Sequence, residues 1–238
     1  MLLNAAVAEA VGELTAELRA ELDARPKVDE AILRVVRKAF QETASVRFEG
    51  NNYSAEWVAE AKARGLLNLA HAPEALEHLV TDQARTLFTS LGILSIPELE
   101  SRFHVKMERY AKDMLIEMHT LVQMVDTLVL PAAYGYLGQL ASGAAQARAA
   151  GIAKIPQVSA ANEVGALAES LQKERAALGA VLEKAEHLHE EPRTLANLLT
   201  NDGAAKMATV RALCDQIENV VADDEWPLPK YREMLFPV

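Results

Sequence analysis

The helical periodicity of the apolar residues is the feature that most constrains the fold of this chain. The first stripe steps by four and three positions and consists of Leu3, Val7, Val11, Leu14, Leu18 and Leu22. This spacing places the side chains on one face of an α-helix, which we expect to end at Arg25-Pro26. A second stripe begins at Val28 and fades near Gln41. The chain is therefore predicted to begin with two amphipathic helices.

Further helices are predicted along the whole chain. Two short ones are expected at 73–80 and 82–91, the second stopped by Gly92. The sequence Ser95-Ile96-Pro97-Glu98 is a capping box with an early proline, and it predicts the start of a long helix. This helix is expected to reach Ala150 and to kink at Pro131, where the ring removes a backbone hydrogen bond.

Two more long helices follow a predicted loop at 151–157. Ser159 is expected to cap the first, which runs to about Glu190, and the second covers roughly Ala204 to Val221. Joined near Pro192, the two resemble an antiparallel hairpin. The predicted fold is all-α: a long-helix bundle with a protruding antiparallel helical hairpin, ending in a tail with a short helical turn.

One short extended or turn segment, near residues 45–53, interrupts the helices. Ser45 to Glu49 alternate and are expected to run extended, and Gly50-Asn51-Asn52 predict a tight turn. Ser54 has the position of an N-cap, with Glu56 in the first turn and Gly65 at the C-terminal end of the helix. We expect Tyr53 and Trp57 to pack this turn onto the body of the protein.

The composition of the chain limits the kinds of partner and the cellular location that we expect. The formal net charge of −10 argues against nucleic acid or an anionic membrane surface as a partner. The single cysteine, Cys214, predicts a buried free thiol, and the start of the chain has no pattern of a secretion signal. The uncharged stretch 127–147 contains glycines, glutamines and Pro131, which indicates a core helix and not a membrane span. We therefore expect a cytoplasmic protein.

The sequence carries no readable active site. Phosphate-binding loops and the nucleophile-elbow pattern are absent. Glu186 and His189 have the i, i+3 spacing of helical di-iron sites, but the Glu74/His78 and Glu100/His104 pairs do not complete such a set. A stripe of methionines is expected to fill the core, with a flexible binding groove as the alternative: Met107, Met114, Met118 and Met124. The acidic cluster 223–225 is expected to cap a surface, with a cation site as the alternative.

A family resemblance enters at Arg47–Leu69. The stretch "FEGNNYSAEWVAEAKARGLLNL" resembles the C-terminal region of type III glutamine synthetases. The matching residues are Phe48, Gly50, Tyr53, Ser54, Glu56, Trp57, Arg64, Gly65, Leu66, Asn68 and Leu69. Asn52 departs from the family pattern, which has glycine there. Further similar stretches follow in the same order: "PELESRF", "LPAAYGY" and "WPLPKYREMLF".

The resemblance implies a whole enzyme that joins ammonia to glutamate using ATP and Mg²⁺ or Mn²⁺. The opening "LLNAAVAEAV" is similar to the helix that ends the family's catalytic domain. Residues 1–25 are therefore expected to be that terminal helix, and residues 26–238 a helical C-terminal domain. No catalytic, cofactor-binding or metal-binding residue of the family is matched here, and we expect none in this chain.

Three hypotheses follow for the function. The first is a structural and assembly region of a type III glutamine synthetase, inactive by itself, whose partners are copies of itself or the remaining synthetase domains. The second is a free-standing helical module that binds a synthetase or another partner. The third is a metal-dependent helical oxidoreductase built around Glu186 and His189.

Overall fold

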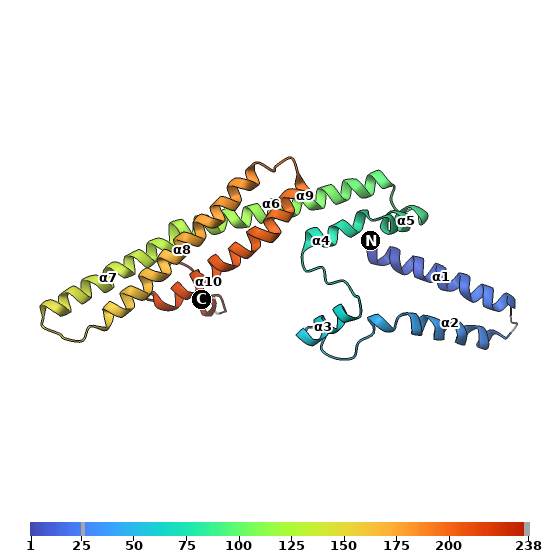
Figure 1. Cartoon of the computed structure of the whole chain (residues 1–238), viewed down its shortest axis with the longest axis horizontal. Coiled ribbons are helices and arrows are strands. Elements are labelled where there is room, and N and C mark those ends of the chain that lie inside the picture. Colours follow the sequence, from blue (N-terminus) through green and yellow to red (C-terminus); the bar gives the residue numbers. More distant parts are fainter. Residues whose placement is uncertain (25–26, 236–238) are drawn as a thin grey trace. The chain divides into compact units, whose positions relative to one another are not determined.

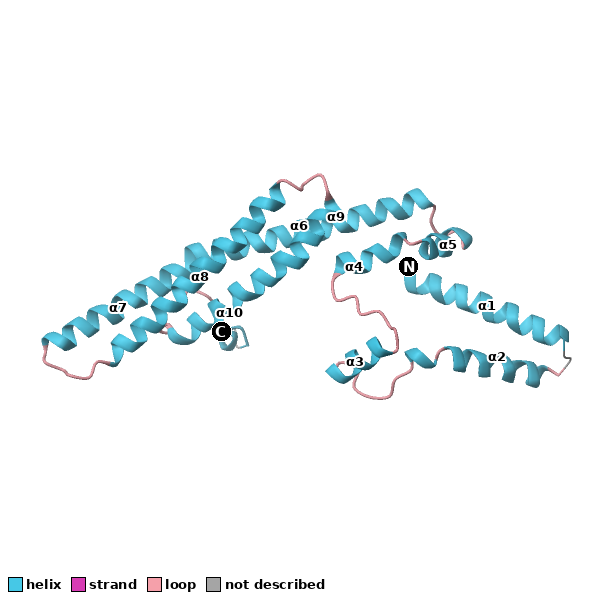
Figure 2. Cartoon of the chain, viewed as in Figure 1, coloured by secondary structure: helices cyan, strands magenta, loops and turns pink. Residues whose placement is uncertain are grey.

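The structure, a computed structural model, describes residues 1–24 and 27–235. These residues form helices, turns and loops, with no strand in the described ranges (Figure 2). The all-α prediction is confirmed. The chain divides into two compact units, an N-terminal unit (Met1–Lys106) and a C-terminal unit (Met107–Val238). The predicted helix end at Arg25-Pro26 lies outside the described residues, and the predicted domain boundary there remains a prediction.

The N-terminal unit contains short helices and one long pair. Its elements are α1 (Leu2–Ala24), α2 (Val28–Glu42), η1 (Ala44–Val46), α3 (Ala55–Ala63), α4 (Ala72–Glu77), η2 (His78–Val80), α5 (Asp82–Ser90) and the first turns of α6 (Ile96–Met124). The two amphipathic helices run side by side as α1 and α2 (Figure 1). A small core forms where Ala5 of α1 packs with Leu87 and Phe88 of α5 and with Leu99 of α6.

The caps predicted in this unit form. The Ser95 N–H and hydroxyl both donate to Oε2 of Glu98, at 2.8 and 2.7 Å, and these bonds hold the pKa of that carboxyl below its ordinary value. Gly92 ends α5 with φ of 64°. These local signals therefore set helix ends as the sequence indicated.

The C-terminal unit is built from long helices. It contains the rest of α6, then η3 (Val125–Val129), α7 (Leu130–Ala149), α8 (Pro156–Glu186), α9 (Pro192–Leu198), η4 (Leu199–Gly203), α10 (Ala204–Val220) and α11 (Tyr231–Leu235). The helix α8 packs against both α7 and α10 (Figure 1). The antiparallel pairing across Pro192 is therefore present, and a second antiparallel pair, α7 with α8, extends beside it.

Several predicted boundaries in this unit were wrong. The long helix is interrupted by a π turn, η3, just before Pro131, where a simple kink was expected. The next helix starts at Pro156, because proline suits the first helical turn, and not at Ser159. It ends at Glu186. The last long helix, predicted at roughly Ala204 to Val221, is confirmed as α10, but the helix α9 and the second π turn, η4, which precede it, were not predicted.

The core of the C-terminal unit is continuous. Leu171 and Leu178 of α8, Val210 and Ile217 of α10 and the π-turn residue Val125 are fully buried there. Among the methionines of the predicted stripe, Met107 and Met118 are buried, Met114 packs against the core and Met124 is half-buried, so the core interpretation of the stripe is confirmed.

Cys214 is a buried free thiol, as predicted. Burial raises its pKa to about 11, because the surrounding apolar atoms disfavour the thiolate. Among the helices that the structure describes, none is long and apolar enough to cross a membrane.

Candidate functional site

The Glu186–His189 pair does not form a metal site. The helix ends at Glu186, so His189 lies on the following turn, where its Nδ1 is 3.1 Å from the backbone oxygen of Glu186. The i, i+3 spacing needed a helix that continues through both residues. In the described ranges, no group of three or more His, Cys, Asp or Glu side chains is placed to hold a metal ion. The basis for the oxidoreductase hypothesis is therefore missing.

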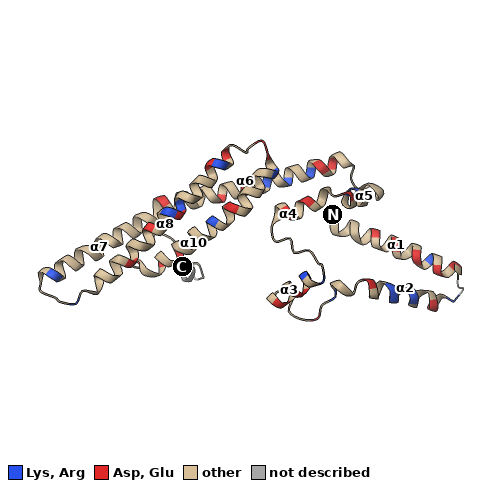
Figure 3. Ribbon diagram, in the orientation of Figure 1, with Lys and Arg blue, Asp and Glu red and all other residues tan. Residues whose placement is uncertain are grey.

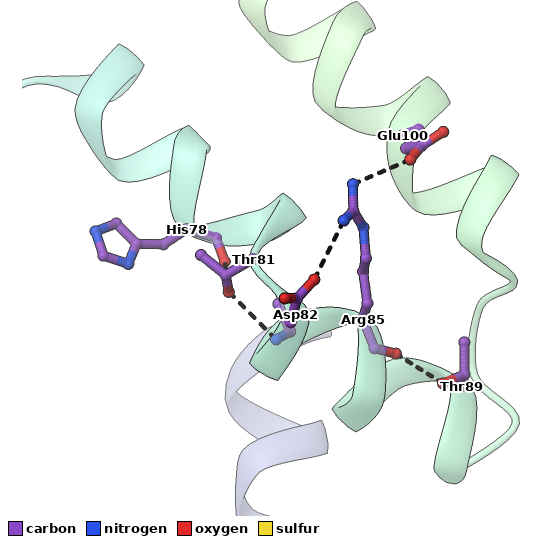
Figure 4. A network of polar contacts seen from close by, with 7 residues as sticks. His78, Thr81, Asp82, Arg85, Thr89 and Glu100 are labelled. Carbon is purple, nitrogen blue, oxygen red and sulfur yellow. Dashed lines mark hydrogen bonds and ion pairs between the residues drawn. The ribbon is translucent and has the colours of Figure 1, made fainter.

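Of the other two Glu/His pairs, Glu100/His104 contributes a structural contact through Glu100. Figure 4 shows Arg85 of α5 reaching Glu100 of α6, with Nη2 to Oε1 at 3.1 Å, and Asp82 at 3.4 Å. Glu100 therefore joins α6 to α5. The His78 ring points away from this network in the same view (Figure 4).

The acidic cluster at 223–225 is engaged by the protein. Lys230 forms an ion pair with Asp223, and Gln139 of α7 donates a hydrogen bond to Glu225. The ion pair lies within the segment after α10, and the bond from Gln139 joins that segment to α7, which agrees with the capping interpretation.

An apolar groove lies between α1 and α2. It measures about 530 Å³ and is lined almost entirely by apolar side chains, among them Val11, Leu14 and Leu18 from α1 and Ile32, Val36 and Phe40 from α2. The first part of the α1 stripe is exposed to solvent: Leu3 is 75% exposed, Val7 54% and Val11 58%, whereas Leu18 and Leu22 are half-buried. Contiguous exposed apolar surface of this kind is typical of interaction sites.

The same helix pair carries charges elsewhere on its surface. Acidic residues lie along α1, and basic residues cluster on α2 (Figure 3). Lys38 of α2 donates to Glu17 of α1 at 2.6 Å, and this hydrogen bond raises the pKa of the lysine. A polar pocket formed by Glu17, Glu21, Arg34 and Lys38 accompanies this contact. The pair is therefore amphipathic as a unit, and among the described residues its apolar groove is open to solvent.

The segment that carries the family resemblance, Arg47–Leu69, folds compactly around the helix α3. Ser54 accepts a hydrogen bond from the Trp57 N–H at 3.3 Å, as predicted for an N-cap, and the Trp57 ring stacks on Phe48 with centroids 4.2 Å apart. Gly50 lies against the Phe48 ring: a Cβ there would be 2.8 Å from the ring, so a larger residue would displace it. Arg64, which follows α3, donates a hydrogen bond to the backbone oxygen of Arg47 at 2.8 Å and so joins the two ends of the fold.

The predicted turn of this segment forms, and two other expectations are wrong. The Ser54 N–H donates to the backbone oxygen of Asn51 at 3.1 Å, and the Asn51 side chain accepts from the Tyr53 N–H at 3.0 Å. Residues Ala44–Val46 form a 3-10 turn, where the chain was expected to run extended from Ser45. Tyr53 is 98% exposed, so it does not pack onto the body, and Trp57 stacks on Phe48 inside the segment.

A second groove lies in the C-terminal unit and was not identified from the sequence. It measures about 700 Å³ and is bordered by α6, η3, α10 and the segment after α10. Its lining includes Met124, Met207, Cys214 and Trp226. Only Met124, in the alternative interpretation of the methionine stripe, pointed toward it.

Comparison with known proteins identifies the domain. Residues 31–148 match the family model of the glutamine synthetase C-terminal domain. The chain is 31% identical to a type-3 glutamine synthetase of Dictyostelium discoideum, over 99% of this chain and 33% of that protein. It is 30% identical to a glutamine synthetase of Bacteroides fragilis, over 98% of this chain and 33% of that protein. A glutamine synthetase of Butyrivibrio fibrisolvens is 30% identical over 88% of this chain and 30% of its own length.

The fold defines a helical protein with two apolar grooves, in which the described residues place no group of three or more His, Cys, Asp or Glu side chains to hold a metal ion. Within that class, residues 31–148 carry a glutamine synthetase C-terminal domain, and nearly the whole chain is similar to a part of a type-3 glutamine synthetase. It spans about a third of the length of the curated relatives it matches.

Proposed function

We propose that this chain is the helical assembly region of a type III glutamine synthetase and is not catalytic by itself. One observation carries the proposal: the apolar groove of α1 and α2 and the adjoining α1 stripe are open to solvent. A monomer gains nothing from exposing such a surface, whereas burial against a partner stabilises a complex through the hydrophobic effect. The partners we assign are the remaining synthetase domains or further copies of this chain.

The activity of the whole enzyme would be the ATP-dependent ligation of ammonia to glutamate. ATP and the divalent metal would bind to parts of the enzyme other than these residues, since the chain lacks the family's ligand motifs. We assign the protein to the cytoplasm, which suits the free Cys214 thiol. Nucleic acid and membrane surfaces are not among the proposed partners, given the net charge of −10.

The second candidate is a free-standing interaction module. It is favoured by the C-terminal unit, whose continuous core of its own does not require another domain to bury its helices. The mass of the endogenous polypeptide, detected with an antibody raised to this chain, separates the two candidates. A band much heavier than 25.9 kDa supports the synthetase region, and a band at that mass supports the module.

An activity assay tests the non-catalytic role directly. The purified chain is expected to form no γ-glutamyl hydroxamate from glutamate, hydroxylamine, ATP and Mg²⁺. Formation of the hydroxamate by this chain alone, lost when ATP is omitted, would show that the catalytic residues lie here after all.

A further inference from the structure

The groove of the C-terminal unit has an adaptable apolar floor. Three of the chain's seven methionines line it, Met124, Met207 and Met234, together with Leu121 and Leu228. Methionine side chains are unbranched and polarizable, so they adjust to apolar partners of different shapes. Val125 and Val129 of the π turn lie beneath them and are fully buried, which gives the floor a rigid base.

One wall of the groove is held in place by specific contacts. Trp226 is 8% exposed and lines the groove from the segment after α10. The Lys230–Asp223 ion pair joins two parts of this segment, and the hydrogen bond from Gln139 to Glu225 fastens it to α7. The groove therefore exists before any partner arrives, which lowers the cost of ordering on binding.

The charged residues that line the groove are mainly acidic. Glu117 of α6 and Asp215 and Glu218 of α10 are accompanied, among the lining residues whose side chains the structure describes, by one basic residue, Arg211. The Arg211 guanidinium donates to Asp215 at 2.6 Å, so this cation is already engaged by a carboxylate. An approaching partner meets an apolar floor with excess negative charge beside it. Such a surface attracts cations and repels anions.

We propose that this groove binds a basic amphipathic helix of a partner protein. Apolar side chains at i, i+3, i+4 and i+7 would enter the methionine-lined floor, and lysine or arginine side chains beside them would meet Glu117 and Glu218. The volume of about 700 Å³ lies within the range of pockets that enclose a ligand of several apolar groups. This site is separate from the α1–α2 groove and does not depend on the assembly role proposed above.

Binding of a peptide to the groove can be measured by the fluorescence of Trp226, which lines it. The chain has two tryptophans, and Trp57→Phe leaves Trp226 as the sole indole. The full chain with this substitution is titrated with a leucine–lysine peptide that has leucines at i, i+3, i+4 and i+7. The expected result is a saturable change in Trp226 fluorescence that weakens with added salt. A peptide with the same leucines and glutamate in place of lysine is expected to bind about tenfold or more weakly.

Charge reversal identifies the groove as the site. The double substitution Glu117→Lys and Glu218→Lys is expected to weaken binding of the basic peptide by about tenfold or more. A matched control, Glu163→Lys with Glu169→Lys on α8, changes the net charge equally away from the groove and should leave the affinity within about twofold.

Three outcomes would overturn the proposal. Equal binding of the basic and acidic peptides would show nonspecific apolar contact. Binding of a small aromatic cation with no binding of the peptide would make this a small-molecule site. Peptide binding that appears only after removal of residues 236–238 would mean that the chain's own end occupies the groove.

Discussion

The helices α1 and α8 carry the same kind of apolar stripe, but the two stripes differ in how far they are buried. Leu171 and Leu178 of α8 are fully buried between α7 and α10, whereas Leu3, Val7 and Val11 of α1 are more than half exposed. Periodicity therefore predicts a helix and its apolar face, but not what covers that face. In the C-terminal unit the cover lies within the chain. In the N-terminal unit the first part of the α1 face is exposed to solvent in the described residues.

Matched leucine truncations test this difference most strongly. Leu178→Ala is expected to lower the free energy of unfolding of the C-terminal unit by about 2–5 kcal/mol, because it leaves a cavity in a closed core. Leu14→Ala, at a side chain that is 41% exposed, should cost the N-terminal unit under about 1 kcal/mol. Urea denaturation is followed through Trp226 in Trp57→Phe, and through Trp57 in Trp226→Phe. Equal costs would show that the α1 face is already covered in the isolated chain.

Two glycines of the C-terminal unit compare a closely packed position with an open one, and the expected changes in stability are smaller than for the leucines. A Cβ on Gly203 would lie 3.0 Å from Sδ of the buried Met118, whereas a Cβ on Gly165 of α8 meets no atom within 4 Å. Gly203→Ala is therefore expected to destabilise this unit by about 1–3 kcal/mol, and Gly165→Ala to stabilise it by about 0.5–1 kcal/mol. Thermal and urea unfolding of the two variants measure this. A stabilising Gly203→Ala would show that the core beside η4 is loose.

The smallest expected effect is a pH dependence in the N-terminal unit. Hydrogen bonds from Ser95 lower the pKa of Glu98, so this carboxylate stabilises the fold above its unfolded pKa, and the contribution is lost as pH falls through the folded pKa. Glu98→Gln should flatten the loss of stability below about pH 4.5, with little effect at neutral pH beyond the weaker cap. Glu13→Gln on α1 is the control. An unchanged acid profile in Glu98→Gln would mean that the capping box is not formed in solution.

The sequence was sufficient to predict those features of the fold whose cause is local. The all-α class and the helix ends at Ser54, Gly92 and Ser95 follow from backbone chemistry within a few residues. The family resemblance at Arg47–Leu69 indicated the domain that the comparisons then identified.

Sequence failed where the cause is tertiary. The π turns η3 and η4 lie where helices pack against each other, and no local signal marks them. Tyr53 looked like an anchor because it stands beside Trp57, but the Phe48 ring takes the place next to the indole. The second groove unites α6, η3, α10 and the segment after α10, which are far apart in the sequence, so its lining could not be predicted.

The most direct test of the central claim is the mass of this chain in solution as its concentration rises. If the α1–α2 surface is an assembly surface, light scattering should show a mass that grows above 25.9 kDa, and Val7→Glu with Val11→Glu should return it to the monomer value without loss of helical content. A wild-type chain that remains at 25.9 kDa at high concentration would contradict the account.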